Sequence, residues 1–255
     1  MNYPRRGKVK EILVSKPFTS LKELQKKFPE VSSMTLRRDI EFFEQQGEVI
    51  KVRGGARAMR FITTTMEQSF SERMSKNTDT KRKIAKEAVG VLESGRSIFL
   101  DSGTTAMELA SLVENKRLSI ITSGPNVAVT LSKNDKVMVH LLGGILNRDN
   151  LSISGAASLD YVNKINIDVA IIVPSGFSVK DGFTCGNYNE CELKEAIIKK
   201  SGKTIMLLAA SKINKSLPYT FCKSENVSTV ITDEVLDDEV TKYFEDNKID
   251  LIIAK

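Results

Sequence analysis

Short apolar runs alternate with helical segments from about residue 78 onward, and this pattern constrains the fold more than any other feature. Seven runs are rich in Val, Ile and Leu and are typical of buried strands: Ser97–Leu100, Leu118–Thr122, Val137–Leu142, Asp168–Val173, Thr204–Leu208, Ser228–Ile231 and Ile249–Ile253. Helical patterns lie between most of them, near Ala106–Val113, Asn126–Leu131, Glu190–Lys200 and Asp237–Phe244. Buried strands that alternate with helices predict an α/β fold with a mostly parallel sheet covered on both faces.

Positive charge is concentrated at the start of the chain. Residues 1–60 contain 14 Lys and Arg against 7 Asp and Glu, whereas residues 61–255 contain 24 against 25. A basic domain for a polyanion, joined to a nearly neutral domain with another task, explains this distribution. A solvated basic surface explains the charge about equally well, so charge alone does not assign a nucleic-acid partner.

The basic segment carries the signals of three short helices and a hairpin. The first helical pattern runs over Arg5–Ser15, the second starts at Ser20, and the third starts near Ser32 or Ser33, either of which can cap it. Glu48–Arg57 then gives a short strand, a Gly-Gly turn and a returning strand with basic residues at the tip. This order of elements predicts a winged helix-turn-helix domain.

The third helix has the chemistry of a DNA-reading element. With Leu36, Ile40 and Phe43 turned to the interior, steps of about 100° leave short polar groups and arginines on the exposed side. Such groups make the contacts to base edges and phosphates on which DNA recognition depends. The candidate DNA-binding residues are Ser33, Met34, Thr35, Arg37 and Arg38, with Lys51 and Arg53 from the hairpin. Taken in isolation, the two arginines fit a solvated pair of surface charges better.

The sharpest motif of the α/β part is Asp101-Ser102-Gly103-Thr104-Thr105, which follows a strand and opens a helix. The glycine lets the backbone approach a ligand, the hydroxyls can donate hydrogen bonds, and a helix N-terminus favours an anion. That is the chemistry of a phosphate cradle, although an ordinary capped turn gives the same signal. Ligands of open α/β sheets gather beyond the carboxyl ends of strands. Other strand ends add small or polar candidates: Ser123, Asn126, Gly143, Gly144, Ser175, Gly176 and Lys212.

Metal and covalent chemistry find little support in the sequence. The cysteines (Cys185, Cys191 and Cys222) are an odd number without ligand-like spacing, and the single histidine, His140, lies in an apolar run typical of a strand. We expect no metal, no cofactor and no catalytic group. Because the sequence shows neither an apolar run of membrane-spanning length nor a signal-peptide pattern, we expect a cytoplasmic protein without a membrane partner.

The basic domain is similar to the DNA-binding domain of the DeoR family of sugar-metabolism repressors. The similarity rests on Val-Ser-Ser-Met-Thr-Leu-Arg-Arg-Asp-Ile at residues 31–40, followed by Glu44, Gly47 and Arg53-Gly54-Gly55-Ala56. It implies that Ser33, Thr35, Arg37 and Arg38 face the major groove of double-stranded DNA.

Residues 78–255 resemble the sensor domain of the same family, whose fold is related to ribose-5-phosphate isomerase and the CoA-transferase group. The resemblance implies that Asp101, Gly103, Thr104 and Thr105 contact a sugar phosphate. It also implies that Glu192, Lys194 and Lys212 line the pocket. Two positions depart from the family pattern: Val173-Pro174 stands where relatives usually have a glycine, and Ala209-Ala210 where they have an acidic residue. Loss of an acid weakens a catalytic interpretation, because proton transfer on a sugar needs a positioned base.

We therefore predict a winged helix-turn-helix domain over residues 1–57, a linker over 58–76 and an α/β effector-sensing and oligomerisation domain over 77–255. The predicted function is repression of a carbohydrate-metabolism operon by a dimer or higher homo-oligomer that a phosphorylated sugar releases from its operator. One alternative is an isomerase-like enzyme of sugar phosphates fused to a basic module, which turnover of pentose or hexose phosphates would reveal. Another is a DNA-binding protein whose α/β domain only oligomerises, which failure to bind any small anion would favour.

Overall fold

A computed structural model of the chain describes all residues except 1–2, 16–17, 47, 53, 59–69 and 115. The chain divides into two compact units, residues 1–66 and 67–255, which we call the head and the body. Each unit has its own hydrophobic core.

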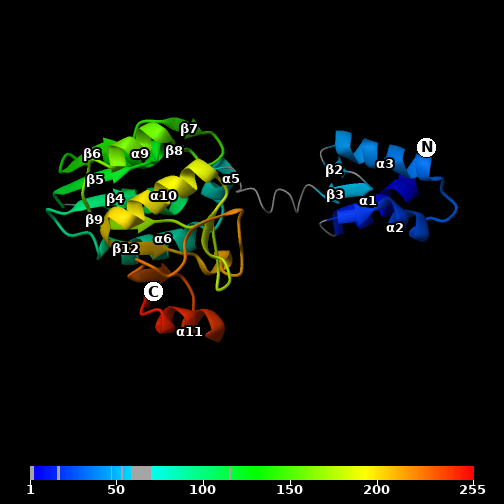
Figure 1. Ribbon diagram of the computed structural model, residues 1–255. Coiled ribbons are helices and arrows are strands. Elements are labelled where there is room, and N and C mark those ends of the chain that lie inside the picture. The colour runs from blue at the N-terminus through cyan, green and yellow to red at the C-terminus, as the bar shows by residue number, and fades with distance from the viewer. Residues whose placement is uncertain (1–2, 16–17, 47, 53, 59–69, 115) are drawn as a thin grey trace. The chain divides into compact units, whose positions relative to one another are not determined.

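The head consists of three helices and a small antiparallel sheet (Figure 1). Its elements are α1 (Tyr3–Ser15), β1 (Phe18–Ser20), α2 (Leu21–Lys27), α3 (Ser33–Gln45), β2 (Val49–Val52) and β3 (Gly55–Ala58). β3 pairs with both β1 and β2, and the β2–β3 hairpin forms the wing. The core contains the predicted apolar face of α3, Leu36, Ile40 and Phe43. The winged helix-turn-helix prediction is confirmed, and β1 is an addition that the sequence did not indicate.

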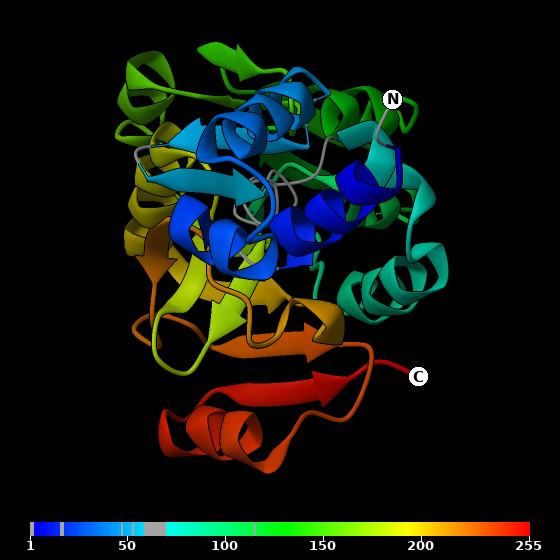
Figure 2. The same cartoon turned by 90° about the vertical axis from the view of Figure 1, so that its right-hand side faces the viewer.

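A seven-stranded sheet forms the centre of the body. Its strands are β4 (Ser97–Leu100), β5 (Leu118–Thr122), β6 (Val137–Leu141), β9 (Ile167–Ile172), β12 (Ser201–Leu207), β14 (Thr229–Thr232) and β15 (Asp250–Ile253). They lie in the order β15-β14-β12-β9-β4-β5-β6, and each neighbouring pair is parallel. In Figure 2 the C-terminal strand β15, in red, lies at one edge of this sheet. The predicted strands and the α/β class are confirmed, apart from shifts at strand ends.

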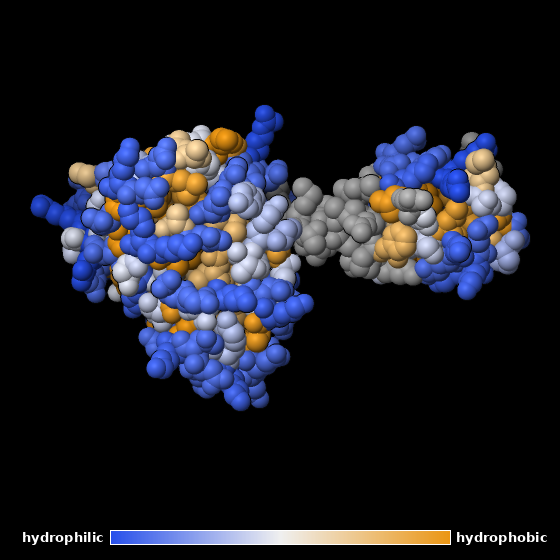
Figure 3. All heavy atoms as spheres, in the orientation of Figure 1, coloured by the Kyte–Doolittle hydropathy of each residue, from blue (hydrophilic) through white to orange (hydrophobic). Residues whose placement is uncertain are grey.

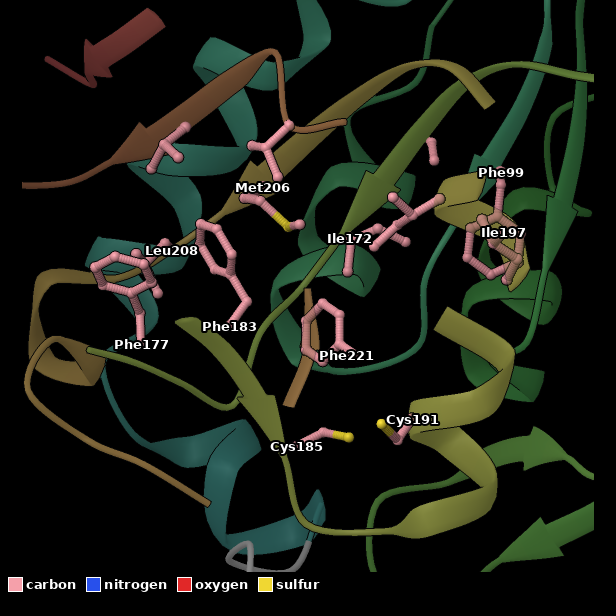
Figure 4. Close-up of a cluster of buried hydrophobic side chains, with 14 of the residues drawn as sticks. Phe99, Ile172, Phe177, Phe183, Cys185, Cys191, Ile197, Met206, Leu208 and Phe221 are labelled. Carbon is pink, nitrogen blue, oxygen red and sulfur yellow. The ribbon is translucent and has the colours of Figure 1, made fainter. Parts of the chain in front are cut away.

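Helices cover both faces of the sheet. One face is covered by α6 (Thr78–Val89), α7 (Thr104–Ser111) and α8 (Pro125–Leu131), and the other by α9 (Ala156–Val162), α10 (Tyr188–Lys200) and α11 (Asp238–Asp246). Successive strand residues point to opposite faces. Ile98 and Leu100 of β4 therefore join the core with α6, α7 and α8, whereas Phe99 joins the core with α9, α10 and α11. Figure 4 shows part of this second core, where the rings of Phe177 and Phe183 pack with centroids 4.7 Å apart.

Several short elements were not predicted. They are α5 (Phe70–Ser75), α9, the hairpin β7 (Ile145–Asn147) and β8 (Ser152–Ser154), the 3-10 turn at Ala210–Lys212, and an antiparallel sheet of β10 (Gly176–Ser178), β11 (Gly182–Cys185) and β13 (Tyr219–Cys222). The strands have three or four residues, too few to show the alternation on which strand prediction depends. α5 lies within the segment predicted as a linker, and its Phe70 is buried in the body. Among the described residues, no helix is both long enough and apolar enough to span a bilayer.

The strand order changes direction between β4 and β9. From β4 the chain adds β5 and then β6 on one side, and it returns to the other side of β4 to form β9 and then β12, β14 and β15. Ligands of open α/β sheets bind beyond the carboxyl ends of strands at such a switch point. The fold thus marks the region after Leu100 and Ile172 as the expected position of a binding site.

Substitutions at two glycines of the head test the pairing of β1 with β3. A Cβ at Gly55 would overlap the carbonyl oxygen of Thr19, whereas a Cβ at Gly7 in α1 meets nothing. Gly55→Ala should destabilise the head by roughly 1–3 kcal/mol because the strands must move apart. Gly7→Ala should stabilise it by up to about 1 kcal/mol through helix propensity. Amide hydrogen exchange in α3 of the full chain measures both effects, and equal exchange in the two variants would contradict the pairing.

Candidate functional site

The helix α3 is capped at its start and joined to α1 at its middle. The Ser32 hydroxyl accepts a hydrogen bond from the backbone N–H of Thr35 at 3.2 Å, so Ser32, not Ser33, is the N-cap. The buried carboxylate of Asp39 accepts hydrogen bonds from Arg5 and Arg6 of α1, at 3.2 and 3.0 Å. These contacts fix the direction in which the outer face of α3 points.

The predicted DNA-binding residues of α3 lie on that outer face. Ser33, Met34, Arg37 and Arg38 are exposed, and Thr35 is half-buried with its hydroxyl 2.9 Å from that of Ser32. Met34 is 60% exposed, so its side chain is also available on this face. Arginines and small polar groups at the start of a helix can contact both bases and phosphates.

The wing is joined to α3 through Lys51. Its Nζ binds the Glu41 carboxylate at 2.5 Å, and its backbone N–H donates to Glu44 at 2.7 Å. The hydrogen bond and charge of Lys51, together with the charges of Arg38 and Arg37, lower the pKa of Glu41 below its ordinary value. A groove between α3 and the wing is lined by Leu21, Arg37, Ile40, Lys51, Val52, Gly54 and Gly55. Arg53 lies outside the described residues, and its role stays a prediction.

In the body, Asp101 joins the two strands that flank the switch point. Its backbone N–H donates to the carbonyl oxygen of Ile171 at 3.0 Å, at the end of β9. Its carboxylate accepts hydrogen bonds from the backbone N–H of Val173 at 2.9 Å and of Ser102 at 2.8 Å. Asp101 is 1% exposed, so this carboxylate is part of the interior.

A buried cluster of charges surrounds Asp101. The Nζ of Lys194 lies 3.0 Å from Asp101 Oδ2 and 2.8 Å from Glu190 Oε1, and it donates to the carbonyl oxygen of Val173 at 3.0 Å. Asn150 donates to the other oxygen of Glu190 at 2.5 Å. Burial disfavours the charged lysine, but the carboxylates of Asp101 and Glu190 outweigh burial and raise its pKa above the ordinary value. Lys194 and Asp101, both predicted to contact an effector, are thus bound to each other.

Unlike Asp101 and Lys194, the hydroxyl groups of the same turn have no hydrogen-bond partner among the described residues. In the described part of the chain, the side chains of Ser102, Thr104 and Thr105 form no hydrogen bond, although they are only 6%, 5% and 6% exposed. Gly103, at a φ of +105°, is the N-cap residue of α7 and supplies no side-chain cap. The first N–H groups of a helix have no partner within it. Hydroxyl and N–H donors without acceptors therefore gather at one point, which is the arrangement that binds an oxyanion.

Some of the other predicted effector residues lie beside this turn. A Cβ at Gly124 would stand 3.1 Å from the Cα of Ser102, so the start of α8 closely approaches the turn. Ser123 is buried with its Oγ 3.5 Å from Asp101, and Asn126 is half-buried in the first turn of α8.

The remaining predicted residues have structural contacts of their own. Gly143 accepts a hydrogen bond from Ser158, and a side chain at Gly144 would strike the hairpin residue Ser154. The backbone N–H of Ser175 donates to Thr184, and Gly176 packs against the backbone of Lys215.

Lys212 and Glu192 also have partners within the protein. Lys212 donates to the carbonyl oxygen of Pro174. Glu192 accepts a hydrogen bond from the Tyr188 hydroxyl at 3.2 Å and is two residues from Lys194, on another side of α10. Contact of these two residues with an effector stays a prediction.

Two members of the buried cluster, Glu190 and Asn150, were not predicted from the sequence. Glu190 lies four residues before Lys194 on a helix, a spacing at which opposite charges meet, so it could have been found. No sequence signal links Asn150 to them. The departure at Val173-Pro174 leaves the cluster intact, because Val173 takes part only through its backbone.

The cysteines and the histidine are structural. All three cysteines are free thiols, and Figure 4 shows the sulfur atoms of Cys185 and Cys191 turned toward one another. Burial raises the pKa of Cys191 to about 11 and that of Cys222 to about 12, which keeps both protonated and unreactive. His140 on β6 pairs with the Tyr161 hydroxyl at 3.3 Å, as expected of a satisfied strand histidine.

A surface hollow at the other end of α7 is a rival position for a ligand. It is lined by Ala110, Ser111, Val113, Glu114, Thr130, Lys133, Asn134 and Asp135. It lies away from the switch point, at the carboxyl end of α7. The helix dipole disfavours an anion at that end. We therefore place the candidate site at Ser102–Thr105.

Comparison with known proteins assigns both units. Residues 5–60 match the DeoR-like helix-turn-helix domain, and residues 76–234 match the DeoR C terminal sensor domain. The chain belongs to the DeoR family. It is 29% identical over 254 residues to the HTH-type transcriptional regulator GolR of Listeria innocua, with 99% of each chain covered. It is 27% identical to the glycerol-3-phosphate regulon repressor of Escherichia coli, with 97% of each chain covered.

This DeoR-family protein is accordingly a helix-turn-helix transcriptional regulator rather than an isomerase-like enzyme. Among solved structures, it is similar to ribose 5-phosphate isomerase A of Methanocaldococcus jannaschii, at 16% identity and a TM-score of 0.41 over 54% of this chain and 55% of that one. A likeness this weak carries no argument about the chemistry of the body.

The buried cluster predicts an unequal effect of two lysine substitutions on α10. Lys194→Met leaves two buried carboxylates without their cation and should lower the free energy of unfolding by roughly 3–5 kcal/mol. Lys199 is 72% exposed and lies 3.6 Å from Glu195, so Lys199→Ala should cost at most about 0.5 kcal/mol. Urea unfolding followed by circular dichroism measures both, and similar small losses would show that the cluster does not stabilise the body.

Proposed function

We propose that this DeoR-family protein represses a carbohydrate-metabolism operon and that a phosphorylated sugar, bound at the N-terminus of α7, releases it from the operator. One observation carries the effector site: the hydroxyls of Ser102, Thr104 and Thr105 form no hydrogen bond with the described residues, although the three residues are only 5–6% exposed. Their oxygen atoms are not sealed from solvent, so these hydroxyls are free to bond to a ligand at the turn.

The charge around the turn favours an anion as that ligand. The carboxylate of Asp101 lies directly below the turn, but the hydrogen-bonded ammonium of Lys194 neutralises it. The N-terminal end of α7 then adds a partial positive charge. A phosphate group satisfies several donors at once, and sugar hydroxyls can bond to polar groups of nearby strand ends such as Ser123 and Asn126.

Operator binding is supported by the outer face of α3 and by the need for two copies. One recognition helix reads only a few base pairs, and helix-turn-helix proteins reach specificity by binding two half-sites as a symmetric pair. We propose a homo-oligomer of at least two copies that acts on DNA in the cytoplasm. Exposed apolar side chains on the edge strand β6 and on the hairpin strand β7 support a contact between copies: Met138 is 65% exposed, Leu141 45%, Ile145 67% and Leu146 49%. Figure 3 shows hydrophobic patches between hydrophilic ones on the face of the body that it draws.

Arg38 should contribute directly to operator binding. Arg38→Ala should weaken binding to a DNA site selected by the wild-type protein from a random pool by about 1–3 kcal/mol if the residue contacts a base. Arg96→Ala, a change of an exposed arginine in the body, should leave affinity unchanged. Fluorescence anisotropy over a range of salt concentrations should also show a steep fall in affinity with salt, because phosphate contacts release counterions. A flat salt response would count against DNA as the partner.

The effector site is tested by thermal shift with phosphorylated sugars and the matching free sugars. An effector at 100 times its dissociation constant should stabilise the body by about 2.7 kcal/mol, and the free sugar should not. Ser102→Ala and Thr105→Val should weaken this effect by roughly tenfold in affinity, because each removes a hydrogen bond to a charged group.

Ser111→Ala, at the opposite end of α7, is the matched control and should bind as the wild type does. Stabilisation by no phosphorylated sugar would contradict the proposed effector. A loss in Ser111→Ala equal to that in Ser102→Ala would move the site to the hollow at the carboxyl end of α7.

A further inference from the structure

The helix α5 lies against the candidate effector turn although it comes from a distant part of the sequence. It is the first described element of the body after residues 59–69, which join the body to the head. Phe70 at its start is 8% exposed, and its backbone N–H donates to the carbonyl oxygen of Asp149 at 2.6 Å. At its other end, the Nζ of the buried Lys81 donates to the carbonyl oxygens of Arg73 and Lys76. α5 is thus held to the body at both ends.

One side chain of α5 reaches the turn itself. The Nη1 atom of Arg73 lies 3.9 Å from the position that a Cβ on Gly103 would occupy. Arg73 is half-buried, so its charge is only partly screened by solvent. A Cβ on Gly103 would meet no other described atom within 4 Å, so the side of the turn that faces Arg73 is not filled by a side chain.

The groups around this turn are complementary to an oxyanion. Ser102, Thr104 and Thr105 supply hydroxyl donors that no described residue accepts from, and each is more than nine-tenths buried. Below them, Lys194 neutralises Asp101. A guanidinium adds paired N–H donors in the plane that fits a phosphate group.

We propose that Arg73 is a further effector-binding residue, whose guanidinium contacts the anionic group held at the N-terminus of α7. This inference rests on the proposed function, because it takes the turn at Gly103 to be the effector site. It adds a specificity-determining cation, so that the site prefers the phosphorylated form of a sugar to the free form.

The position of Arg73 also suggests how effector binding is coupled to DNA binding by the head. An effector that binds Arg73 acts on α5, the element that directly follows residues 59–69. α5 is joined in addition to the buried cluster, because Asp149 accepts from Phe70 and its neighbour Asn150 donates to Glu190. Suppose that the DNA-binding and the released conformations differ in the position of α5. An effector that binds one of them more tightly then shifts the protein toward that conformation and changes its affinity for DNA.

The test compares Arg73→Ala, Arg73→Lys and the matched control Arg82→Ala, which removes an exposed arginine of α6. Inorganic phosphate, ribose 5-phosphate, glucose 6-phosphate and glycerol 3-phosphate are titrated calorimetrically into the full chain. Arg73→Ala should raise the dissociation constant of the bound phosphate compound by about 10- to 100-fold, the usual scale of a charge-assisted hydrogen bond. Arg73→Lys should lose less, and Arg82→Ala should stay within about twofold of the wild type.

A second readout separates binding from folding. Without effector, Arg73→Ala should keep wild-type affinity for the selected DNA site and a melting temperature within a few degrees of wild type, but more phosphate compound should be needed to release the DNA. If Arg73→Ala does not fold, Arg73→Gln, which keeps most of the side-chain volume and loses the charge, takes its place. Wild-type affinity in these variants, with Ser102→Ala impaired, would overturn the role of Arg73 and leave the proposed function standing. If the wild type binds none of the four compounds and no other phosphorylated sugar, both fail.

Discussion

Lys194 places a full positive charge inside the body, and such a charge is tolerated only with carboxylates at hydrogen-bonding distance. Asp101 and Glu190 supply them, at 3.0 and 2.8 Å. Asp101 in turn binds the backbone at the end of β9, so the ion pair joins α10 to the two strands where the sheet changes direction. The turn at Ser102–Thr105 stands on this base. Because Lys194 neutralises the carboxylate of Asp101, the hydroxyls of the neighbouring turn are not needed to compensate that charge. They can therefore donate hydrogen bonds to a ligand.

The unequal distribution of positive charge along the sequence corresponds to different uses of charge in the head and the body. In the head, ionic contacts such as Arg5 and Arg6 with Asp39 lie beneath α3 and leave Arg37 and Arg38 on its outer face. In the body, the strongest ionic contacts are internal, and the candidate ligand site uses hydroxyl and N–H donors. In the function that we propose, the regulator recognises DNA by exposed charge and its effector by polar groups of a nearly buried turn. Arg73 would bring a cation to this second site from the element nearest to the head in sequence.

Periodicity was enough to predict the sheet, the winged helix and the flanking helices other than α9, because long runs such as Asp168–Val173 must be buried on both faces. It could not predict β10, β11 and β13, whose few residues are held by contacts with each other and with residues 213–217. The Ser102–Thr105 turn was identified because its residue types are distinctive. The partner of Lys194 was not identified, although Glu190 lies four residues before it on the predicted helix, a spacing that brings opposite charges together. Arg73 was missed because α5 is one short helix in a segment without a regular pattern.

The proposed regulation depends on an effector bound at the amino end of α7, and hydrogen–deuterium exchange tests this most directly. The full chain is compared with and without the phosphorylated sugar that stabilises it, and protection is followed peptide by peptide. Protection should be greatest in residues 101–107, at the start of α7, with a second protected region at residues 70–76, in and after α5. Protection centred instead on residues 110–114 and 130–135, around the hollow at the carboxyl end of α7, would contradict it.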